Sequence, residues 1–267
     1  MDFSKIGAMK FIKSLAAKLL RFAGILAVIY VSMVFYLALT ERRNAYPRAI
    51  SHKEARTAIA KDAQPLNCTL EDGTVLEGWK LGSSKTPTLL YYPDADEDAA
   101  QFLAELGSIP EVTLVTFNYR GSGNNKGTPS SENFTPDSRE ILECATQVNG
   151  LRPKYIIGRG TGSILAYNVS SKQNRLLMID PVESIAEALV YKYGFLYPKV
   201  LIRAPESINT GKSEPSIDQI GILLDRAQFT YRSQKVIENF SGAPVWKRDG
   251  RPFREIFTNY LQSYSRN

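Results

Sequence analysis

The chain has 267 residues, of which 43% are hydrophobic and 22% are charged, and its formal net charge at pH 7 is +6. This composition excludes a disordered or a collagen-like chain. Residues 1–61 hold 11 Lys or Arg and 3 Asp or Glu, whereas the remainder holds 22 and 24. Because nucleic-acid binding requires a basic face on the domain itself, we expect no nucleic-acid partner.

An uncharged stretch of 19 residues, Phe22–Thr40, follows a basic N-terminal segment at residues 1–21. Its length is sufficient for a helix that crosses the hydrocarbon core of a bilayer. A cleaved signal peptide would have a shorter apolar region and a small-residue cleavage site after it. We therefore expect residues 22–40 to be an uncleaved transmembrane helix, with membrane lipid as one partner.

Five cations precede this stretch and five follow it closely, so the flanking charge does not by itself determine the orientation. Translocating a short tail with five cations is unfavourable, whereas a long following domain is translocated largely regardless of its charge. We predict a single-pass protein with a cytoplasmic N-terminus and an extracytoplasmic domain. Residues 11–22 also fit a basic amphipathic helix on anionic lipid.

Residues 41–64 are polar and contain Pro47, which predicts a partly helical linker before a domain at residues 65–267. The domain opens with a hairpin whose turn contains Asp72-Gly73. Short apolar strands and helices then alternate. The predicted strands are 66–70, 75–81, 88–92, 112–118, 155–157, 176–179, 217–224 and 244–246; the predicted helices are 96–106, 136–148, 162–171, 182–198, 231–240 and 252–264. This alternation predicts an α/β fold with a mostly parallel sheet, helices on both faces and an antiparallel edge.

The two cysteines fall in different predicted elements. Cys68 lies in the first strand and Cys144 in the helix at residues 136–148. Cysteines in core elements of a sizeable domain are often buried thiols, so we favour two free thiols, with a disulfide as the alternative.

The turn after the strand at residues 155–157 carries the most informative motif. It reads Gly158-Arg159-Gly160-Thr161-Gly162-Ser163, between a buried strand and a helix start. This is the setting of a nucleophile elbow, Gly-x-Ser-x-Gly, whose middle residue attacks the substrate. Here that residue is Gly160, which has no side chain, so the elbow of Gly158, Gly160 and Gly162 is degenerate.

Two neighbouring hydroxyls, those of Thr161 and Ser163, are candidate substitute nucleophiles. A hydroxyl nucleophile needs a base in contact with it. The one histidine of the sequence, His52, lies in the predicted linker. We therefore expect no intact catalytic residue.

A second motif lies in residues 116–127, Thr-Phe-Asn-Tyr-Arg-Gly-Ser-Gly-Asn-Asn-Lys-Gly. Together with the elbow and the helix between them, it resembles the α/β-hydrolase superfamily, in particular its membrane-anchored, serine-aminopeptidase-like branch, over residues 66–264. The resemblance implies an α/β-hydrolase-like fold.

The sequence departs from that family at four places. The nucleophile is Gly160, and the oxyanion loop is replaced by Tyr92-Pro93-Asp94. The acid position falls near Ala227 or Gln228, beside Asp225, and the terminal histidine position falls in residues 244–253, where Lys247 and Arg248 occur. These departures predict a catalytically inactive protein that binds or scaffolds an unknown protein or small-molecule ligand.

The candidate pocket residues are Asp94, Tyr119, Arg159 and Asp180. One alternative is a serine-type ester or peptide hydrolase with a non-standard site. Another is a dinucleotide-binding protein, because the glycines of the elbow precede a helix and Asp180 ends the next strand. The third glycine of that motif is Ser163, so we expect no cofactor.

The acidic run Asp94-x-Asp96-x-Asp98 is similar to part of a calcium-binding loop. The glycine that such a loop requires is replaced by Ala99. Acids before a helix also complement its N-terminus. We therefore expect no metal.

Overall fold

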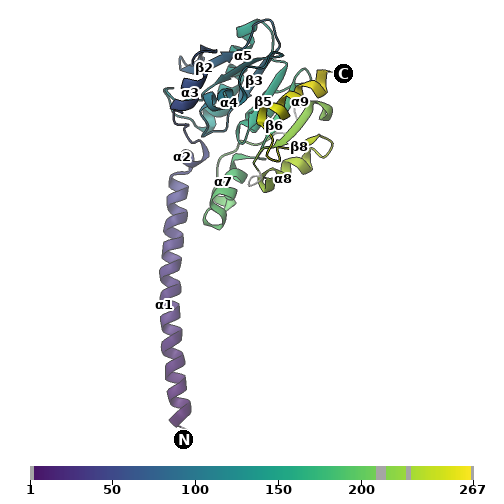
Figure 1. Ribbon diagram of the computed structural model, residues 1–267. Helices are drawn as coiled ribbons and strands as arrows, with labels where there is room; N and C mark the ends of the chain where they lie inside the picture. The colour runs from purple at the N-terminus through teal and green to yellow at the C-terminus, as the bar shows by residue number, and fades with distance from the viewer. Residues whose placement is uncertain (1–2, 209–214, 227–229, 266–267) are drawn as a thin grey trace.

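A long N-terminal helix leads into a domain built on one twisted sheet (Figure 1). The computed structural model describes residues 3–208, 215–226 and 230–265. Within them the sheet has eight strands in the order β1-β2-β4-β3-β5-β6-β7-β8. The strands are β1 (Ala63–Thr69), β2 (Val75–Leu81), β3 (Thr88–Tyr92), β4 (Thr113–Phe117), β5 (Tyr155–Arg159), β6 (Arg175–Ile179), β7 (Ile220–Leu224) and β8 (Val245–Lys247).

The pairing of the strands confirms the predicted α/β fold. β1 pairs with β2 and β2 with β4 in antiparallel fashion, and the remaining pairs from β4 to β8 are parallel. The predicted strand at residues 217–224 is shorter, because its first turn is the 3-10 helix η3 (Ile217–Gln219).

Helices cover both faces of the sheet. They are α2 (Glu41–Ala45), α3 (Lys53–Ile59), α4 (Ala99–Leu106), α5 (Ser131–Asn149), α6 (Gly162–Val169), α7 (Ile185–Tyr193), α8 (Thr230–Asn239) and α9 (Phe253–Ser265), with 3-10 turns η1 (Gly194–Leu196) and η2 (Lys199–Leu201) after α7. Successive residues of β5, Ile156 and Ile157, are fully buried in opposite cores, with α5, α6 and α8 on one face and α3, α4 and α9 on the other. A strand buried on both faces requires this continuous apolar run.

The helix α1 (Phe3–Leu39) is continuous, so residues 11–22 do not form a separate surface helix. In the described part of the chain one segment, Lys13–Leu39, is long and apolar enough to cross a membrane by length and composition. It includes most of the predicted span at residues 22–40. In Figure 1 it extends away from the domain, which leaves nearly all of its side chains exposed.

The segment at residues 41–64 packs directly on the domain. Ala55 and Ile59 of α3 are buried in the core beside α4. The Arg56 guanidinium binds the buried carboxylate of Asp98 at 2.7 Å and that of Glu77 at 2.9 Å. These contacts join α3 to α4 and, through Glu77, to β2.

Cys68 of β1 and Cys144 of α5 form a disulfide, with their Cα atoms 5.7 Å apart. The expectation of two free thiols was therefore wrong. The two cysteines are 76 positions apart in the sequence, so no local pattern predicted that they lie close together. Their proximity arises because α5 crosses back over the antiparallel edge of the sheet and contacts β1.

Candidate functional site

The turn after β5 has the strand–turn–helix geometry of a nucleophile elbow. Gly160 has a φ of +54°, a left-handed conformation that strains a residue with a side chain. Gly158 and Gly162 permit close backbone packing, since a Cβ on either would lie 2.4 Å or less from a backbone oxygen. The sequence motif thus forms the expected turn, with no side chain at its centre.

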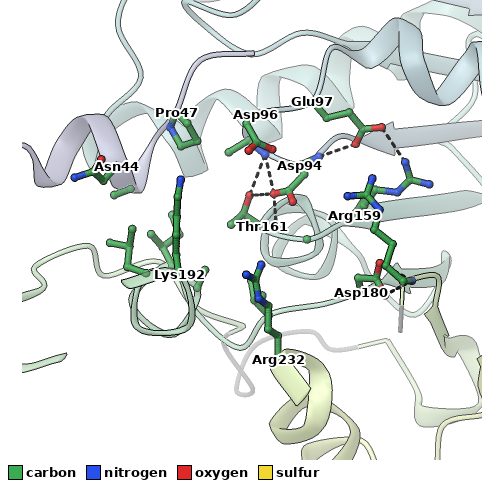
Figure 2. A pocket seen from close by; sticks show the side chains of 18 residues that line it. Asn44, Pro47, Asp94, Asp96, Glu97, Arg159, Thr161, Asp180, Lys192 and Arg232 are labelled. Carbon is green, nitrogen blue, oxygen red and sulfur yellow. Dashed lines mark hydrogen bonds and ion pairs between the residues drawn. The ribbon is translucent and has the colours of Figure 1, made fainter. Parts of the chain in front are cut away.

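The carboxylate of Asp94 fills the space beside Gly160 (Figure 2). Its Oδ1 accepts hydrogen bonds from Thr161 N at 3.0 Å, Thr161 Oγ1 at 2.6 Å and Ala95 N at 2.9 Å. A Cβ on Gly160 would lie 2.2 Å from Asp94 Oδ2. The side chain of Asp94 and any side chain at position 160 therefore compete for the same volume.

The two backbone donors to Asp94 are Thr161 N and Ala95 N, and N–H groups at such positions form the oxyanion hole of an active nucleophile elbow. In a working elbow, an oxyanion is held by the N–H that follows the nucleophile and by an N–H in the loop after β3. Thr161 N and Ala95 N occupy these two positions in the chain. Asp94 Oδ1 thus accepts hydrogen bonds from two N–H groups at the chain positions that bind the oxyanion in an active elbow.

The candidate substitute nucleophiles are both engaged in local hydrogen bonds. Thr161 Oγ1 donates to Asp94 and accepts from Ala95 N at 3.1 Å. Ser163 is fully buried and its Oγ donates to Gly158 O at 2.8 Å. His52 caps α3 by accepting from Ala55 N at 3.2 Å. The structure therefore brings neither hydroxyl into contact with a histidine.

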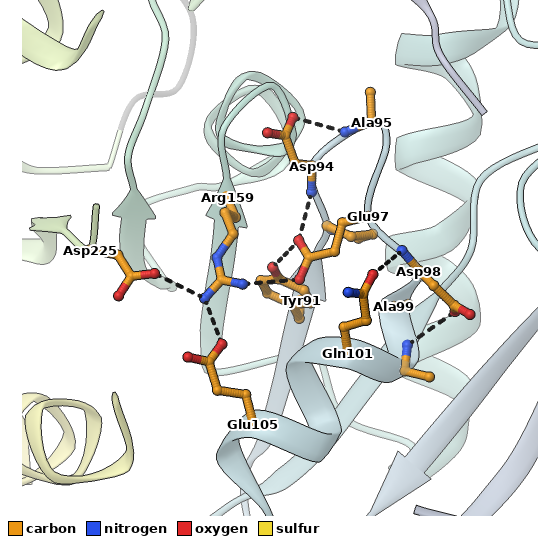
Figure 3. A network of polar contacts seen from close by, with 12 residues as sticks. Tyr91, Asp94, Ala95, Glu97, Asp98, Ala99, Gln101, Glu105, Arg159 and Asp225 are labelled. Atoms are coloured by element: carbon orange, nitrogen blue, oxygen red, sulfur yellow. Dashed lines mark hydrogen bonds and ion pairs between the residues drawn. The ribbon is translucent and has the colours of Figure 1, made fainter. Parts of the chain in front are cut away.

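A network of charges joins the ends of β3, β5 and β7 with α4 (Figure 3). The buried guanidinium of Arg159 pairs with Glu97 at 3.0 Å, Glu105 at 3.2 Å and Asp225 at 3.7 Å. Arg248, after β8, donates to Asp225 at 2.7 Å. The acid that follows β7 is thus bound by two guanidinium groups, and an arginine stands in the region where the resemblance placed a histidine.

This network was not expected from the sequence, in which Arg159 was only a candidate pocket residue and the acid position was centred on Ala227 and Gln228. Those two residues lie outside the described part of the chain. The available signal was opposite charge at the carboxyl ends of strands that a parallel sheet places side by side.

Asp180 follows β6 with a φ of +45° and is 5% exposed. Its carboxylate accepts hydrogen bonds from Asp225 N at 2.9 Å and Arg226 N at 3.3 Å. Burial raises the pKa of Asp180 to about 6, although these backbone donors oppose the increase. The side chain that a dinucleotide site would direct at a ribose instead bonds to the loop after β7.

A pocket of about 130 Å³ lies at the carboxyl ends of β3, β5 and β6, between α2 and α7 (Figure 2). Asp94, Arg159 and Asp180 line it, as the sequence analysis expected. Tyr119 does not, because its hydroxyl donates to Pro93 O at 2.8 Å behind the loop. Further lining residues include the acid Asp96, the cations Lys192, Arg226 and Arg232, and the apolar residues Pro47, Val182, Ile185 and Leu189. The pocket can accommodate a ligand that carries both charges beside an apolar group.

The acidic residues of the β3–α4 loop have different structural roles. Asp98 caps α4 and binds Arg56, whereas Asp94 and Asp96 face the pocket. Burial, and then the neighbouring Asp94, raise the pKa of Asp96. Among the described residues, no group of three or more His, Cys, Asp or Glu side chains is arranged to hold a metal ion.

The loop that carries the second motif is held by ion pairs. Arg120 pairs with Asp137 of α5 at 2.7 Å and with Asp72 of the β1–β2 turn. Gly121 and Gly123 have φ values of +73° and +60°. The two glycines of this motif are therefore explained by the backbone conformation of the loop and do not indicate a catalytic role.

No family model matches the sequence. Lysophosphatidylserine lipase ABHD12 of Danio rerio is 30% identical over 94 residues, covering 30% of this chain and 25% of that protein. The YfhR protein of Escherichia coli K12 is 24% identical over 123 residues, covering 42% and 43%. The chain thus spans less than half the length of these two relatives.

Solved structures match over more of the chain. An α/β-hydrolase from Vibrio vulnificus has a TM-score of 0.66 at 16% identity and covers 85% of this chain and 92% of its own. The Pyrococcus furiosus esterase Pf2001 has a TM-score of 0.56 at 15% identity and covers 82% and 93%. These similarities establish the fold that the two sequence motifs predicted.

Proposed function

We propose that this chain, which has the α/β-hydrolase fold, is a membrane-anchored protein without hydrolase activity that binds a small ligand or a partner at the pocket beside Asp94. The observation that carries the proposal is the hydrogen bonding of Asp94 Oδ1 to Thr161 N and Ala95 N. The activities named for the relatives belong to those proteins.

Catalysis of acyl transfer needs donors that are free to stabilise a developing negative charge. Here those donors already hold a carboxylate, and a substrate oxyanion would have to displace or repel it. Gly160 offers no attacking atom, and His52, which caps α3, offers no base. Three requirements for serine-type hydrolysis are thus unmet at one site.

The disulfide and α1 support the location. Disulfides persist in oxidising compartments and are rare in the cytosol, which supports an extracytoplasmic domain. The exposed, apolar α1 supports membrane anchoring.

The test of inactivity is activity profiling of the full chain in detergent, with a fluorophosphonate probe and a panel of esters. We expect no labelling and no turnover above that of a heat-denatured sample. Turnover that Thr161→Ala or Ser163→Ala abolishes would overturn the proposal and identify a relocated nucleophile.

The test of binding uses lysophosphatidylserine as the first probe, because its headgroup carries both charges and its chain is apolar, as the pocket lining requires. We expect it to raise the thermal midpoint of the wild type without being hydrolysed. Lys192→Ala should reduce that increase, and Lys85→Ala, an exposed residue in the β2–β3 turn, is the matched control. An increase with nicotinamide dinucleotides instead would favour the dinucleotide alternative.

A further inference from the structure

The turn after α7 lies beside the long N-terminal helix (Figure 1). The Tyr30 hydroxyl donates a hydrogen bond to Phe195 O at 3.1 Å, and the two rings stack with their centroids 6.3 Å apart. Because Phe195 belongs to η1, the contact fixes this turn at the level of Tyr30 along α1.

That level is within the apolar part of α1. Tyr30 precedes the end of the helix at Leu39 by nine residues, which corresponds to roughly 13 Å along the axis at a rise of about 1.5 Å per residue. It also lies inside the uncharged stretch at residues 22–40. A bilayer that surrounds this stretch must therefore also reach the turn.

The turn has the surface that such a position requires. Phe195 is 79% exposed and Val200 is 88% exposed, and Leu201 beside them is also exposed. Cations flank these apolar side chains: Lys192 precedes them, Arg203 follows them, and Lys199, which pairs with Glu187, lies among them. Exposed apolar residues with basic neighbours are typical of segments that enter the interface of an anionic membrane.

We propose that residues 194–201 form a second membrane contact, in which Phe195, Val200 and Leu201 insert into the leaflet that adjoins the domain. This inference rests on the proposed anchoring by α1. It places α7 with one end at the lipid and with Leu189 and Lys192 in the pocket wall.

The experiment uses the full chain in vesicles of phosphatidylcholine with a minor fraction of phosphatidylglycerol. Because the native cysteines form the disulfide, one introduced cysteine can carry an environment-sensitive fluorophore. Three variants are compared: Val200→Cys in the turn, Ile25→Cys in α1, and Leu151→Cys. Leu151 is 74% exposed and precedes the amino end of β5, whereas the pocket lies at the carboxyl ends of the parallel strands. The quencher is phosphatidylcholine with a nitroxide on its acyl chain.

We expect the labels at positions 25 and 200 to lose most of their emission in nitroxide vesicles, and the label at 151 to keep its emission. Quenching at 25 without quenching at 200 would overturn the second contact and leave the anchor intact. No quenching at 25 would overturn the anchoring and the inference with it. Equal quenching at 200 and 151 would also overturn the inference, since it would show no preference for the turn.

Discussion

At the scale of single residues, Asp94 and Gly160 depend on each other. The carboxylate of Asp94 reaches Thr161 N only because position 160 has no Cβ to occupy its place. Conversely, Gly160 adopts its positive φ without the strain that a serine would bear there. Asp94 and Gly160 thus form one local arrangement, in which the absence of a Cβ at position 160 leaves room for the carboxylate.

Gly160→Ser should destabilise the protein by more than the backbone strain of about 1–3 kcal/mol, because its Cβ would also displace Asp94. Gly150→Ser is the matched control, since Gly150 has a φ of +69° and a Cβ there would meet open space. Urea unfolding should show a greater loss at position 160 than at 150, and adding Asp94→Ala should recover part of the difference. Equal losses at the two glycines would contradict the competition for space. We expect efficient ester hydrolysis neither from Gly160→Ser nor from Gly160→Ser combined with Asp94→Ala.

Asp180 predicts a specific pH dependence. Burial raises the pKa of its carboxyl to about 6 in the folded state, from 3.8. The folded protein therefore binds a proton that the unfolded chain has already released, and this group makes stability fall as pH rises from about 4 to about 6. The loss of stability is of the order of 2–3 kcal/mol at most, and it is complete above about pH 7.

Asp180→Asn removes this titration, and asparagine tolerates the positive φ well. We expect the difference in unfolding free energy between variant and wild type to change across pH 4–6 and to be constant above pH 7. Other titrating groups are common to both proteins and cancel in the difference. Parallel stability profiles over this range would show that Asp180 does not titrate there.

At the scale of elements, α3 is joined to the sheet by charge as well as by apolar contact. Asp98 has a fully buried side chain, and Arg56 supplies its ion pair while Asn118 and the N–H groups of His52 and Ala100 supply further hydrogen bonds. A buried charge that loses its partner costs about 3–5 kcal/mol. The pKa of Asp98 is accordingly held below its usual value, against the effect of burial.

The chain of residues 41–267 should therefore unfold cooperatively and at a higher temperature than that of residues 62–267, which lacks α2 and α3. Thermal unfolding followed by circular dichroism compares the two. Arg56→Ala in the longer chain should reproduce much of the loss, and Lys61→Ala, an exposed residue after α3, should not. Equal midpoints for the two chains would show that α3 contributes nothing to the fold.

At the scale of the whole molecule, the long helix, the disulfide and the turn at residues 194–201 imply one arrangement relative to a membrane. α1 leaves the domain beside α7 (Figure 1), so the proposed anchoring would place the pocket, at the carboxyl ends of the parallel strands, on the side of the domain nearer the membrane. A disulfide between β1 and α5 fits a domain that folds outside the reducing cytosol.

A topology reporter fused after Asn267 should accordingly be active on the far side of the membrane from Met1. In the same cells, Cys68 and Cys144 should resist alkylation by a permeant maleimide until a reductant is added, because they are paired. Reporter activity in the cytoplasm, or free thiols in the mature protein, would contradict the extracytoplasmic location.

Sequence alone determined the strands, most helices, and the glycine turn that follows β5. These signals lie within a few residues of one another: an apolar run such as Tyr155–Ile157, a glycine turn, and a helix start. A pattern of this kind can be recognised in the sequence itself, because backbone periodicity and turn chemistry depend on neighbouring residues. The fold class and the degenerate elbow could therefore be predicted from the order of the residues.

The tertiary structure decided which distant residues meet. It placed Asp94 against Thr161 because β3 and β5 are neighbours in the sheet, although 67 residues separate the two in sequence. The same principle joined Arg159 to Asp225, Cys68 to Cys144 and Tyr30 to Phe195. Such contacts follow from strand order and helix crossing, which no local pattern encodes. They are the reason why the sequence could show that position 160 carries no side chain, but not that the Asp94 carboxylate accepts hydrogen bonds from Thr161 N and Ala95 N.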